Sequence, residues 1–220
     1  RSCLVGSEMC IRDRSTISTS DIDGDSDLDL FLGTRLNAGS YGIKTQNYIL
    51  INNGRGVFED QSDEYFGDNR LMGMVTDSEF VDIDLDGTKE LIVVGEWMPV
   101  GVYKIDNRKF INISSKLGLD KSNGLYNTLE VVINKDSFPD IIIGNHGLNS
   151  FFKASKSHPL TMYVNDFDRN GRTEQIMGMY YGDDLYPVVQ LKDLWMQIPS
   201  LKKQFLKFEN YKWMSFSLRK

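Results

Sequence analysis

The chain has 220 residues, of which 40% are hydrophobic and 11% aromatic, and this is enough apolar material for one large domain or two small ones. The formal net charge is −6, and no basic cluster alternates with aromatic residues, so we expect no nucleic-acid ligand. No apolar run reaches the roughly 18 residues that span a bilayer, which predicts that this stretch contains no transmembrane segment.

Residues 1–14 differ in character from the rest of the chain. They have neither helical nor strand periodicity, and the stretch LVGSEMCIRDR resembles a translated transposase sequencing adapter. We therefore predict that residues 1–14 are not native protein and that the native start is absent. Both cysteines, Cys3 and Cys10, lie in this segment, so the authentic chain would have neither a disulfide nor a thiol nucleophile.

One nine-residue pattern occurs three times in the remaining sequence. Residues 21–29 (loop 1) read DIDGDSDLD, residues 82–90 (loop 2) read DIDLDGTKE, and residues 166–174 (loop 3) read DFDRNGRTE. Each copy has Asp at positions 1 and 3, Asp or Asn at position 5, and Asp or Glu at position 9. Position 6 is glycine in loops 2 and 3 but Ser26 in loop 1, where a turn with positive φ is harder to form.

This spacing suits a hard cation such as Ca²⁺, which takes six to eight oxygen ligands at roughly 2.3–2.6 Å. Side chains at positions 1, 3 and 5 would point inward, a backbone carbonyl at position 7 would add an oxygen, and the acid at position 9 would close the shell. Without a cation the carboxylates would repel one another. The predicted metal-binding residues are Asp21, Asp23, Asp25, Asp27, Asp29, Asp82, Asp84, Asp86, Thr88, Glu90, Asp166, Asp168, Asn170, Arg172 and Glu174.

The same acidic pattern has two alternative interpretations. An EF-hand opens with the same pattern but needs an acid at position 12 and flanking helices, whereas position 12 is here Leu32, Val93 or Met177, in short apolar runs typical of strands. The second alternative is an ordinary Asp-rich turn that binds no metal. Three copies in one register favour the metal, and we expect a structural rather than a catalytic ion.

The three loops belong to a longer repeat. Loops 1 and 2 start at residues 21 and 82, 61 residues apart, and each is followed by a strand–turn–strand pattern, YILINNGRGVFEDQS and VGVYKIDNRKFINIS. A degenerate copy, VVINKDSFPDIIIGN, keeps Asn134, Asp136 and Asp140 but has Val132 at position 1. We expect weak metal binding there, or none.

The motifs DIDGDSDLDLFLG, DIDLDGTKELIVVG, FPDIIIGN and DFDRNGRTE resemble the FG-GAP or VCBS repeat family over roughly residues 18–180. The resemblance implies an all-β fold in which residues 15–188 form a β-propeller fragment of about three to four blades, of the integrin α-subunit type, with cations in loops between neighbouring strands. Closed propellers have about four to eight blades. We therefore expect a fragment with unpaired edges that is poorly stable or self-associating on its own.

Residues 189–220 change character. The apolar residues between 189 and 213 recur near the 3.6-residue helical period and predict one or two short helices broken at Pro199; they are Leu191, Leu194, Trp195, Ile198, Leu201, Phe205 and Phe208. The lysines of this segment are expected to form a solvated face. A helix that binds a membrane or a partner is the alternative.

Signatures of catalysis are sparse. The sequence has no G-x-S-x-G elbow, P-loop or G-x-G-x-x-G motif, and His146 and His158 have no second histidine at metal spacing. The prediction is a non-enzymatic, Ca²⁺-stabilised module, extracellular or on the outer cell surface, that binds a protein or glycan as a monomer or as part of a larger chain. The alternative is a propeller enzyme such as a polysaccharide lyase, which would need a basic or tyrosyl residue facing the sugar across a groove.

Overall fold

The computed structural model describes residues 12–37, 39–134, 138–147 and 149–203. Strands dominate these residues, which confirms the predicted all-β class. The chain divides into two compact units, the first made of Arg1–Ala38 and Ile43–His146, the second of Gly39–Gly42 and Gly147–Lys220. Within the described part, no helix is both long and apolar enough to cross a membrane.

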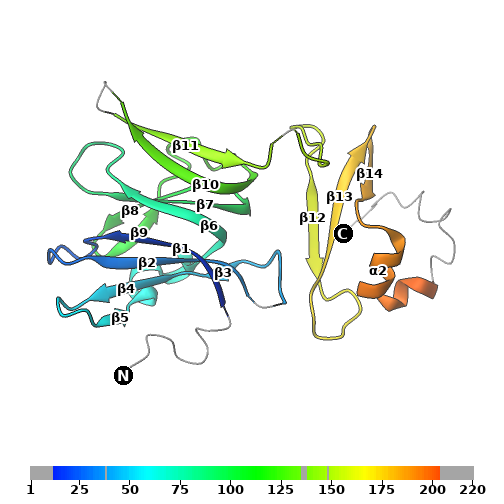
Figure 1. Cartoon of the computed structure of the whole chain (residues 1–220), viewed down its shortest axis with the longest axis horizontal. Helices are drawn as coiled ribbons and strands as arrows, with labels where there is room; N and C mark the ends of the chain where they lie inside the picture. The colour runs from blue at the N-terminus through cyan, green and yellow to red at the C-terminus, as the bar shows by residue number, and fades with distance from the viewer. Residues whose placement is uncertain (1–11, 38, 135–137, 148, 204–220) are drawn as a thin grey trace. The chain divides into compact units, whose positions relative to one another are not determined.

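The first unit contains two complete four-stranded antiparallel blades (Figure 1). Blade 1 has the strand order β1-β2-β4-β5 and consists of β1 (Arg12–Ser20), β2 (Asp29–Asn37), β4 (Tyr48–Asn52) and β5 (Phe58–Asp60). Blade 2 pairs its strands in chain order and consists of β6 (Leu71–Val81), β7 (Glu90–Met98), β8 (Gly101–Asp106) and β9 (Lys109–Asn112). Both predicted hairpins are therefore present as β4–β5 and β8–β9.

A third pair of strands follows in the same unit. Strands β10 (Gly124–Ile133) and β11 (Pro139–Asn145) form an antiparallel hairpin, and the start of β10 also pairs with the end of β7. The short β3 (Thr45–Gln46) pairs with β6, and the helical turns α1 (Ser62–Phe66) and η2 (Gly67–Arg70) connect blade 1 to blade 2. The first unit thus holds two whole blades and the first two strands of a third.

The first strands of successive blades interact with each other. Ser18 on β1 donates its hydroxyl to the carbonyl of Ser78 on β6, at 2.8 Å, and Asp77 on β6 accepts the backbone N–H of Leu129 on β10, also at 2.8 Å. Blades that pack through their first strands are typical of a propeller, where these strands surround the central axis. This arrangement confirms the predicted propeller fragment (Figure 1).

The core of the first unit lies between blades 1 and 2. Phe31 and Ile49 of blade 1 are completely buried in one cluster with Leu91 and Phe110 of blade 2. Phe66 of α1 stacks on Phe110, with ring centroids 5.0 Å apart. The alternating apolar strands predicted from the sequence therefore bury their side chains against the neighbouring blade, and α1 covers the same core.

A glycine ends the apolar run of each second strand because the first strand comes very close. A Cβ atom on Gly33 would lie 2.5 Å from Thr16, and one on Gly144 would lie 2.2 Å from Thr128. In each case the threonine is the cross-strand partner of the glycine. The glycine is therefore required by packing, since real Cβ atoms do not approach other heavy atoms so closely.

The second unit is a three-stranded antiparallel meander with a short helix. Its elements are β12 (Thr161–Asn165), β13 (Glu174–Tyr181), β14 (Asp184–Pro187), α2 (Leu191–Gln197) and η3 (Pro199–Lys203). Leu191 and Leu194 of α2 are buried with Ile176 of β13 and with Ile198. The predicted C-terminal helical segment and its break near Pro199 are thus present, whereas Phe205 and Phe208 lie outside the described residues.

Strand β1 begins within the segment that we predict not to be native. Arg12, Asp13 and Arg14 pair with residues of β2, with irregular register on both sides of Arg14. Cys3, Cys10 and the rest of 1–11 lie outside the described residues. The foreign origin of residues 1–14 stays a prediction.

Candidate metal centres

Each of the three acidic loops joins the first strand of a blade or meander to its second strand. Loop 1 connects β1 to β2, loop 2 connects β6 to β7, and loop 3 connects β12 to β13. Position 12 of the pattern, which would carry an acid in an EF-hand, falls inside β2, β7 and β13. The loops are therefore flanked by strands, as the apolar runs predict, and the EF-hand is excluded.

The acids of each loop hold the backbone of their own turn. In loop 1 the carboxylate of Asp21 accepts the N–H of Ser26 at 3.0 Å, and Asp25 accepts the N–H of Asp27 at 2.9 Å. The same two contacts, from position 6 to position 1 and from position 7 to position 5, recur in loops 2 and 3 at 2.8–2.9 Å. One sequence pattern therefore gives one loop geometry three times.

Two residues in each loop have positive φ. Position 6 is Ser26 (φ 74°), Gly87 (φ 91°) or Gly171 (φ 84°), as the glycine preference there predicts. Position 4 is also left-handed, at Gly24 (φ 84°), Leu85 (φ 57°) and Arg169 (φ 61°), a requirement that the sequence pattern did not reveal. Because Cβ-bearing residues are disfavoured in this region, loop 1 carries strain at Ser26, and loops 2 and 3 carry it at position 4.

The acid at position 9 lies at the root of its loop and is buried. Asp29 and Glu90 are 0% exposed and Glu174 is 6% exposed. Each accepts the N–H of position 2, from Ile22, Ile83 or Phe167, at 2.7–3.0 Å. The position 9 acid therefore ties the two ends of the loop together, in addition to its predicted role as a ligand.

Asp29 differs from the other two because both of its oxygens accept backbone hydrogen bonds. Its Oδ2 accepts the N–H of Ile22 at 2.7 Å, and its Oδ1 accepts the N–H of Asn52 on β4 at 2.8 Å. In loop 2, by contrast, Oε1 of Glu90 is buried and accepts no hydrogen bond within the described residues. Asp29 thus links the loop to β4 through its two hydrogen bonds, whereas Glu90 keeps an oxygen that can face a cation.

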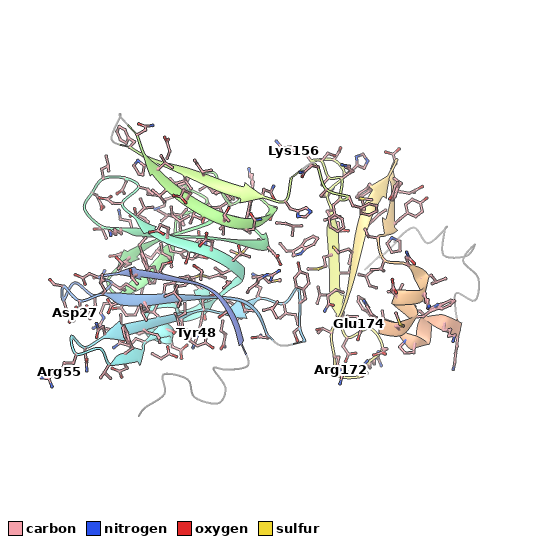
Figure 2. The ribbon with its side chains drawn as sticks, viewed as in Figure 1. Asp27, Tyr48, Arg55, Lys156, Arg172 and Glu174 are labelled. Carbon is pink, nitrogen blue, oxygen red and sulfur yellow. The ribbon has the colours of Figure 1, made fainter. Side chains whose placement is uncertain are left out.

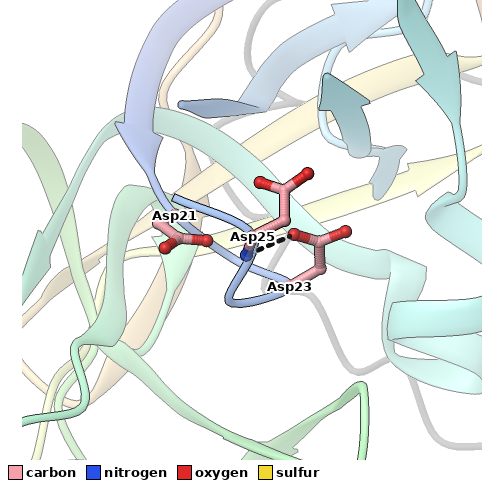
Figure 3. A group of neighbouring side chains, drawn as sticks. All are labelled: Asp21, Asp23 and Asp25. Carbon is pink, nitrogen blue, oxygen red and sulfur yellow. Dashed lines mark hydrogen bonds between the residues drawn. The ribbon is translucent and has the colours of Figure 1, made fainter. Parts of the chain in front are cut away.

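Three groups of carboxylates converge closely enough to share an ion. One oxygen from each member lies within 4.8 Å of the others in the groups Asp21, Asp23, Asp25; Asp82, Asp84, Asp86; and Asp166, Asp168, Glu174. Figure 3 shows the first group around the loop 1 turn, where the backbone N–H of Asp25 also donates to Asp23 at 3.2 Å. These donors are all hard oxygens, the type that Ca²⁺ and Mg²⁺ prefer.

The remaining predicted ligands lie in the same turns. Asn170 at position 5 of loop 3 accepts the N–H of Arg172 through its side chain, as Asp86 does from Thr88 in loop 2. Figure 2 shows Arg172 at the tip of loop 3 and Glu174 at its root. That position 7 (Asp27, Thr88 and Arg172) offers its carbonyl to a cation stays a prediction.

Loops 1 and 2 differ in their electrostatics. In loop 1 partial burial raises the pKa of Asp23, and the neighbouring carboxylates of Asp25, Asp29 and Asp21 raise it further. In loop 2 a hydrogen bond from the Lys104 ammonium lowers the pKa of Asp86. In loop 2 a lysine forms ion pairs with the carboxylates, whereas in loop 1 the only cationic influence on Asp23 among the described residues is the electrostatic attraction of Arg108.

The degenerate copy lacks the geometry of the other three. Asp140, its position 9 acid, is exposed and accepts a hydrogen bond from the side chain of Asn134 at 2.7 Å. Val132 supplies no oxygen at position 1, and Asp136 lies outside the described residues. The expectation of weak or absent metal binding here stays a prediction.

The comparison with known families agrees with this repeated loop. Residues 21–121 match the FG-GAP-like repeat, a span that includes loops 1 and 2 and every strand of blades 1 and 2 except β1. A search of curated proteins gave no significant match. Residues 21–121, which carry the acidic loop and the strands that follow it twice in succession, are thus a segment of FG-GAP-like repeats.

Proposed function

We propose that this chain is a non-enzymatic, Ca²⁺-stabilised binding or adhesion module that works outside the cell or on its surface. The observation that carries the proposal is the threefold recurrence of one oxygen-lined loop, in which three acids converge on a shared point. Such a group of like charges favours a bound cation, since a cation removes the repulsion between the carboxylates. FG-GAP-like repeats support the extracellular setting.

Calcium is the favoured ion because the loops are mostly exposed and their oxygen donors come from one irregular turn. Ca²⁺ tolerates irregular shells of six to eight oxygens, whereas Mg²⁺ demands a near-ideal octahedron. Extracellular modules of this kind typically bind Ca²⁺ with dissociation constants of about 10⁻⁴ to 10⁻³ M, which matches the calcium outside cells.

An ion in loop 1 would also order a neighbouring surface turn. The side chain of Asn52 donates to the carbonyl of Leu28 at 3.3 Å, and a Cβ on Gly54 would lie 2.5 Å from the carboxylate of Asp27. Figure 2 shows Asp27 and the exposed Arg55, next to Gly54, at the same end of blade 1. Loops on a rigid scaffold commonly carry binding residues, so this end of the blade is a candidate contact surface for a protein or glycan.

The alternative, a polysaccharide lyase, would need a basic or tyrosyl residue that faces the sugar across a groove. Tyr181 and Tyr186 contact each other on the β13–β14 hairpin, with ring centroids 6.0 Å apart, whereas Tyr180 packs on His158 at 4.8 Å. Because successive strand residues point to opposite faces, Tyr180 and Tyr181 project away from each other. Among the residues that the structure describes, we find no contact that specifically favours the enzyme.

Calorimetric titration of the full chain with Ca²⁺ tests the metal part of the proposal. Asp23→Asn and Asp168→Asn should each remove one binding event because each deletes a charge from a different loop. Asp120→Asn, an exposed acid outside the loops, is the matched control and should leave the titration unchanged. A chain that takes up no Ca²⁺ at millimolar concentration would contradict the proposal.

A glycan array and a screen against extracellular-matrix proteins test the binding part. The full chain should retain a ligand in Ca²⁺ and lose it in EDTA, and Asp23→Asn should weaken retention while Asp120→Asn does not. Cleavage of a polysaccharide with release of unsaturated products would instead favour the enzyme.

A further inference from the structure

The carboxylate oxygens of loop 2 fall into two sets. One set holds the turn: Asp82 accepts the N–H groups of Asp86 and Gly87 at 3.0 and 2.8 Å, and Glu90 Oε2 accepts that of Ile83 at 3.0 Å. The other set consists of one oxygen each from Asp84, Asp86 and Glu90. Together with Asp82, which converges with Asp84 and Asp86, this second set is where a cation would be expected to bind.

A lysine ammonium already lies against that second set. Nζ of Lys104 is 2.8 Å from Asp84 Oδ2, 2.5 Å from Asp86 Oδ2 and 3.3 Å from Glu90 Oε1. The last of these oxygens is buried, and the Lys104 ammonium is the positive charge beside it.

The position of the lysine is fixed by blade 2. Lys104 lies on β8, directly after Tyr103, which pairs with Leu91 at position 10 of the pattern. β8 pairs with both β7 and β9, and the Lys104 side chain is 30% exposed. The pairing of β8 with β7 therefore places this basic side chain beside loop 2.

Blade 1 has an aliphatic residue at the equivalent place. Leu30, at position 10 of loop 1, pairs with Leu50 on β4, so the residue that corresponds to Lys104 is Ile51. Ile51 is buried in the apolar core. No ion pair reaches the aspartates of loop 1 from any described residue. The two blades therefore provide an internal comparison of the same loop with and without a lysine.

We infer that Lys104 acts as a built-in substitute for the cation of loop 2, so that this loop binds Ca²⁺ more weakly than loops 1 and 3 and keeps its fold without metal. This inference rests on the proposed function, since it concerns competition with Ca²⁺. An entering ion has to displace the ammonium from three carboxylates. The charge available to the ion is thereby reduced, and ligand charge is what tunes the calcium affinity of such loops.

Site-resolved NMR on the full chain tests the inference because each loop contains a reporter glycine. The N–H groups of Gly24, Gly87 and Gly171 donate to the first aspartate of loops 1, 2 and 3. In a Ca²⁺ titration the Gly87 signal should shift at a higher Ca²⁺ concentration than the other two. In Lys104→Ile, which places the residue of blade 1 in blade 2, the Ca²⁺ concentration at the midpoint of the Gly87 shift should fall by at least about tenfold. In Lys104→Arg, which keeps the charge, this midpoint should not fall.

Stability in EDTA gives a second measurement that does not depend on bound metal. Lys104→Ile should melt at a lower temperature than the parent chain, since three carboxylates then face one another, and Lys104→Arg should melt close to the parent. If Gly87 shifts together with Gly24 and Gly171 and Lys104→Ile leaves its midpoint unchanged, the inference is wrong and the calcium proposal stands. If no glycine shifts in either the parent or Lys104→Ile, both are wrong.

Discussion

Loops 1 and 2 share one sequence pattern and one backbone geometry, yet they balance their negative charge differently. Among the described residues, the five aspartates of loop 1, from Asp21 to Asp29, form no ion pair, although Arg108 attracts Asp23 electrostatically. Burial and neighbouring acids raise the pKa of Asp23. Loop 2 has Lys104 within 2.5–3.3 Å of three of its acids. A ligand pattern in the sequence therefore does not by itself show how strongly the fold of a loop depends on a bound ion.

The largest difference between the loops should appear at the position 9 acid. Asp29 accepts two backbone N–H groups through two oxygens, and an amide can satisfy only one of them. We expect Asp29→Asn to lower the free energy of unfolding by about 3 kcal/mol, since it leaves a backbone donor without an acceptor and removes a charge-assisted bond. Urea unfolding in EDTA measures this change without any contribution from metal.

The matching change in loop 2 should have a smaller effect. Glu90→Gln can keep the bond from Ile83 through its amide oxygen, so we expect a loss of about 1 kcal/mol. Asp140→Asn, at the exposed position 9 of the degenerate copy, should stay within about 0.5 kcal/mol of the parent. Equal losses for Asp29→Asn and Glu90→Gln would mean that the second bond of Asp29 does not hold the loop to β4.

Salt should act on the two loops unequally in the absence of metal. Repulsion between exposed carboxylates is screened as NaCl rises from about 0.02 to about 0.5 M, so the metal-free chain should gain stability. Asp25→Asn, which removes a charge from loop 1, should reduce this gain. Asp86→Asn should not reduce it because its charge is already paired with Lys104. Thermal melts in EDTA at the two salt concentrations measure the gain in melting temperature for each variant. Equal gains in Asp25→Asn and Asp86→Asn would contradict the proposed difference in charge balance between the two loops.

A further small effect is expected at position 6 of the loops. Ser26 has a φ of 74°, which most residues with a Cβ adopt only at a penalty of about 1 kcal/mol, so Ser26→Gly should stabilise the chain by about that amount. The reverse change, Gly87→Ser in loop 2, should destabilise it by a similar amount, since a Cβ there would meet nothing within 4 Å and only the backbone is affected. Chemical unfolding measures the change in the free energy of unfolding for each variant. Changes of opposite sign in Ser26→Gly and Gly87→Ser would support the shared geometry of the two loops, and changes of the same sign would refute it.

Much of the fold followed from periodic features of the sequence. The apolar runs after each acidic loop predict buried strands, the Asn-Gly turn predicts the β4–β5 hairpin, and the change of period near residue 189 predicts α2. These signals are local, because each depends on residues close together in the chain. The repeat at residues 21 and 82 then indicates that the local units are copies of one blade.

What the sequence could not reveal depends on contacts between distant residues. Lys104 lies 18 residues after Asp86, and only the pairing of β7 with β8 brings it to loop 2. The second partner of Asp29, Asn52, is likewise supplied by a neighbouring strand. The left-handed position 4 was hidden because Gly24, Leu85 and Arg169 share no chemical feature that marks the conformation.

A crystal structure of the chain grown in millimolar CaCl₂, with anomalous diffraction recorded at long wavelength, tests most directly whether the loops bind Ca²⁺. We expect an anomalous peak between Asp21, Asp23 and Asp25 and another between Asp166, Asp168 and Glu174, each with oxygen ligands at roughly 2.3–2.6 Å. Loops that keep the same turn but show only water at these positions would contradict this expectation.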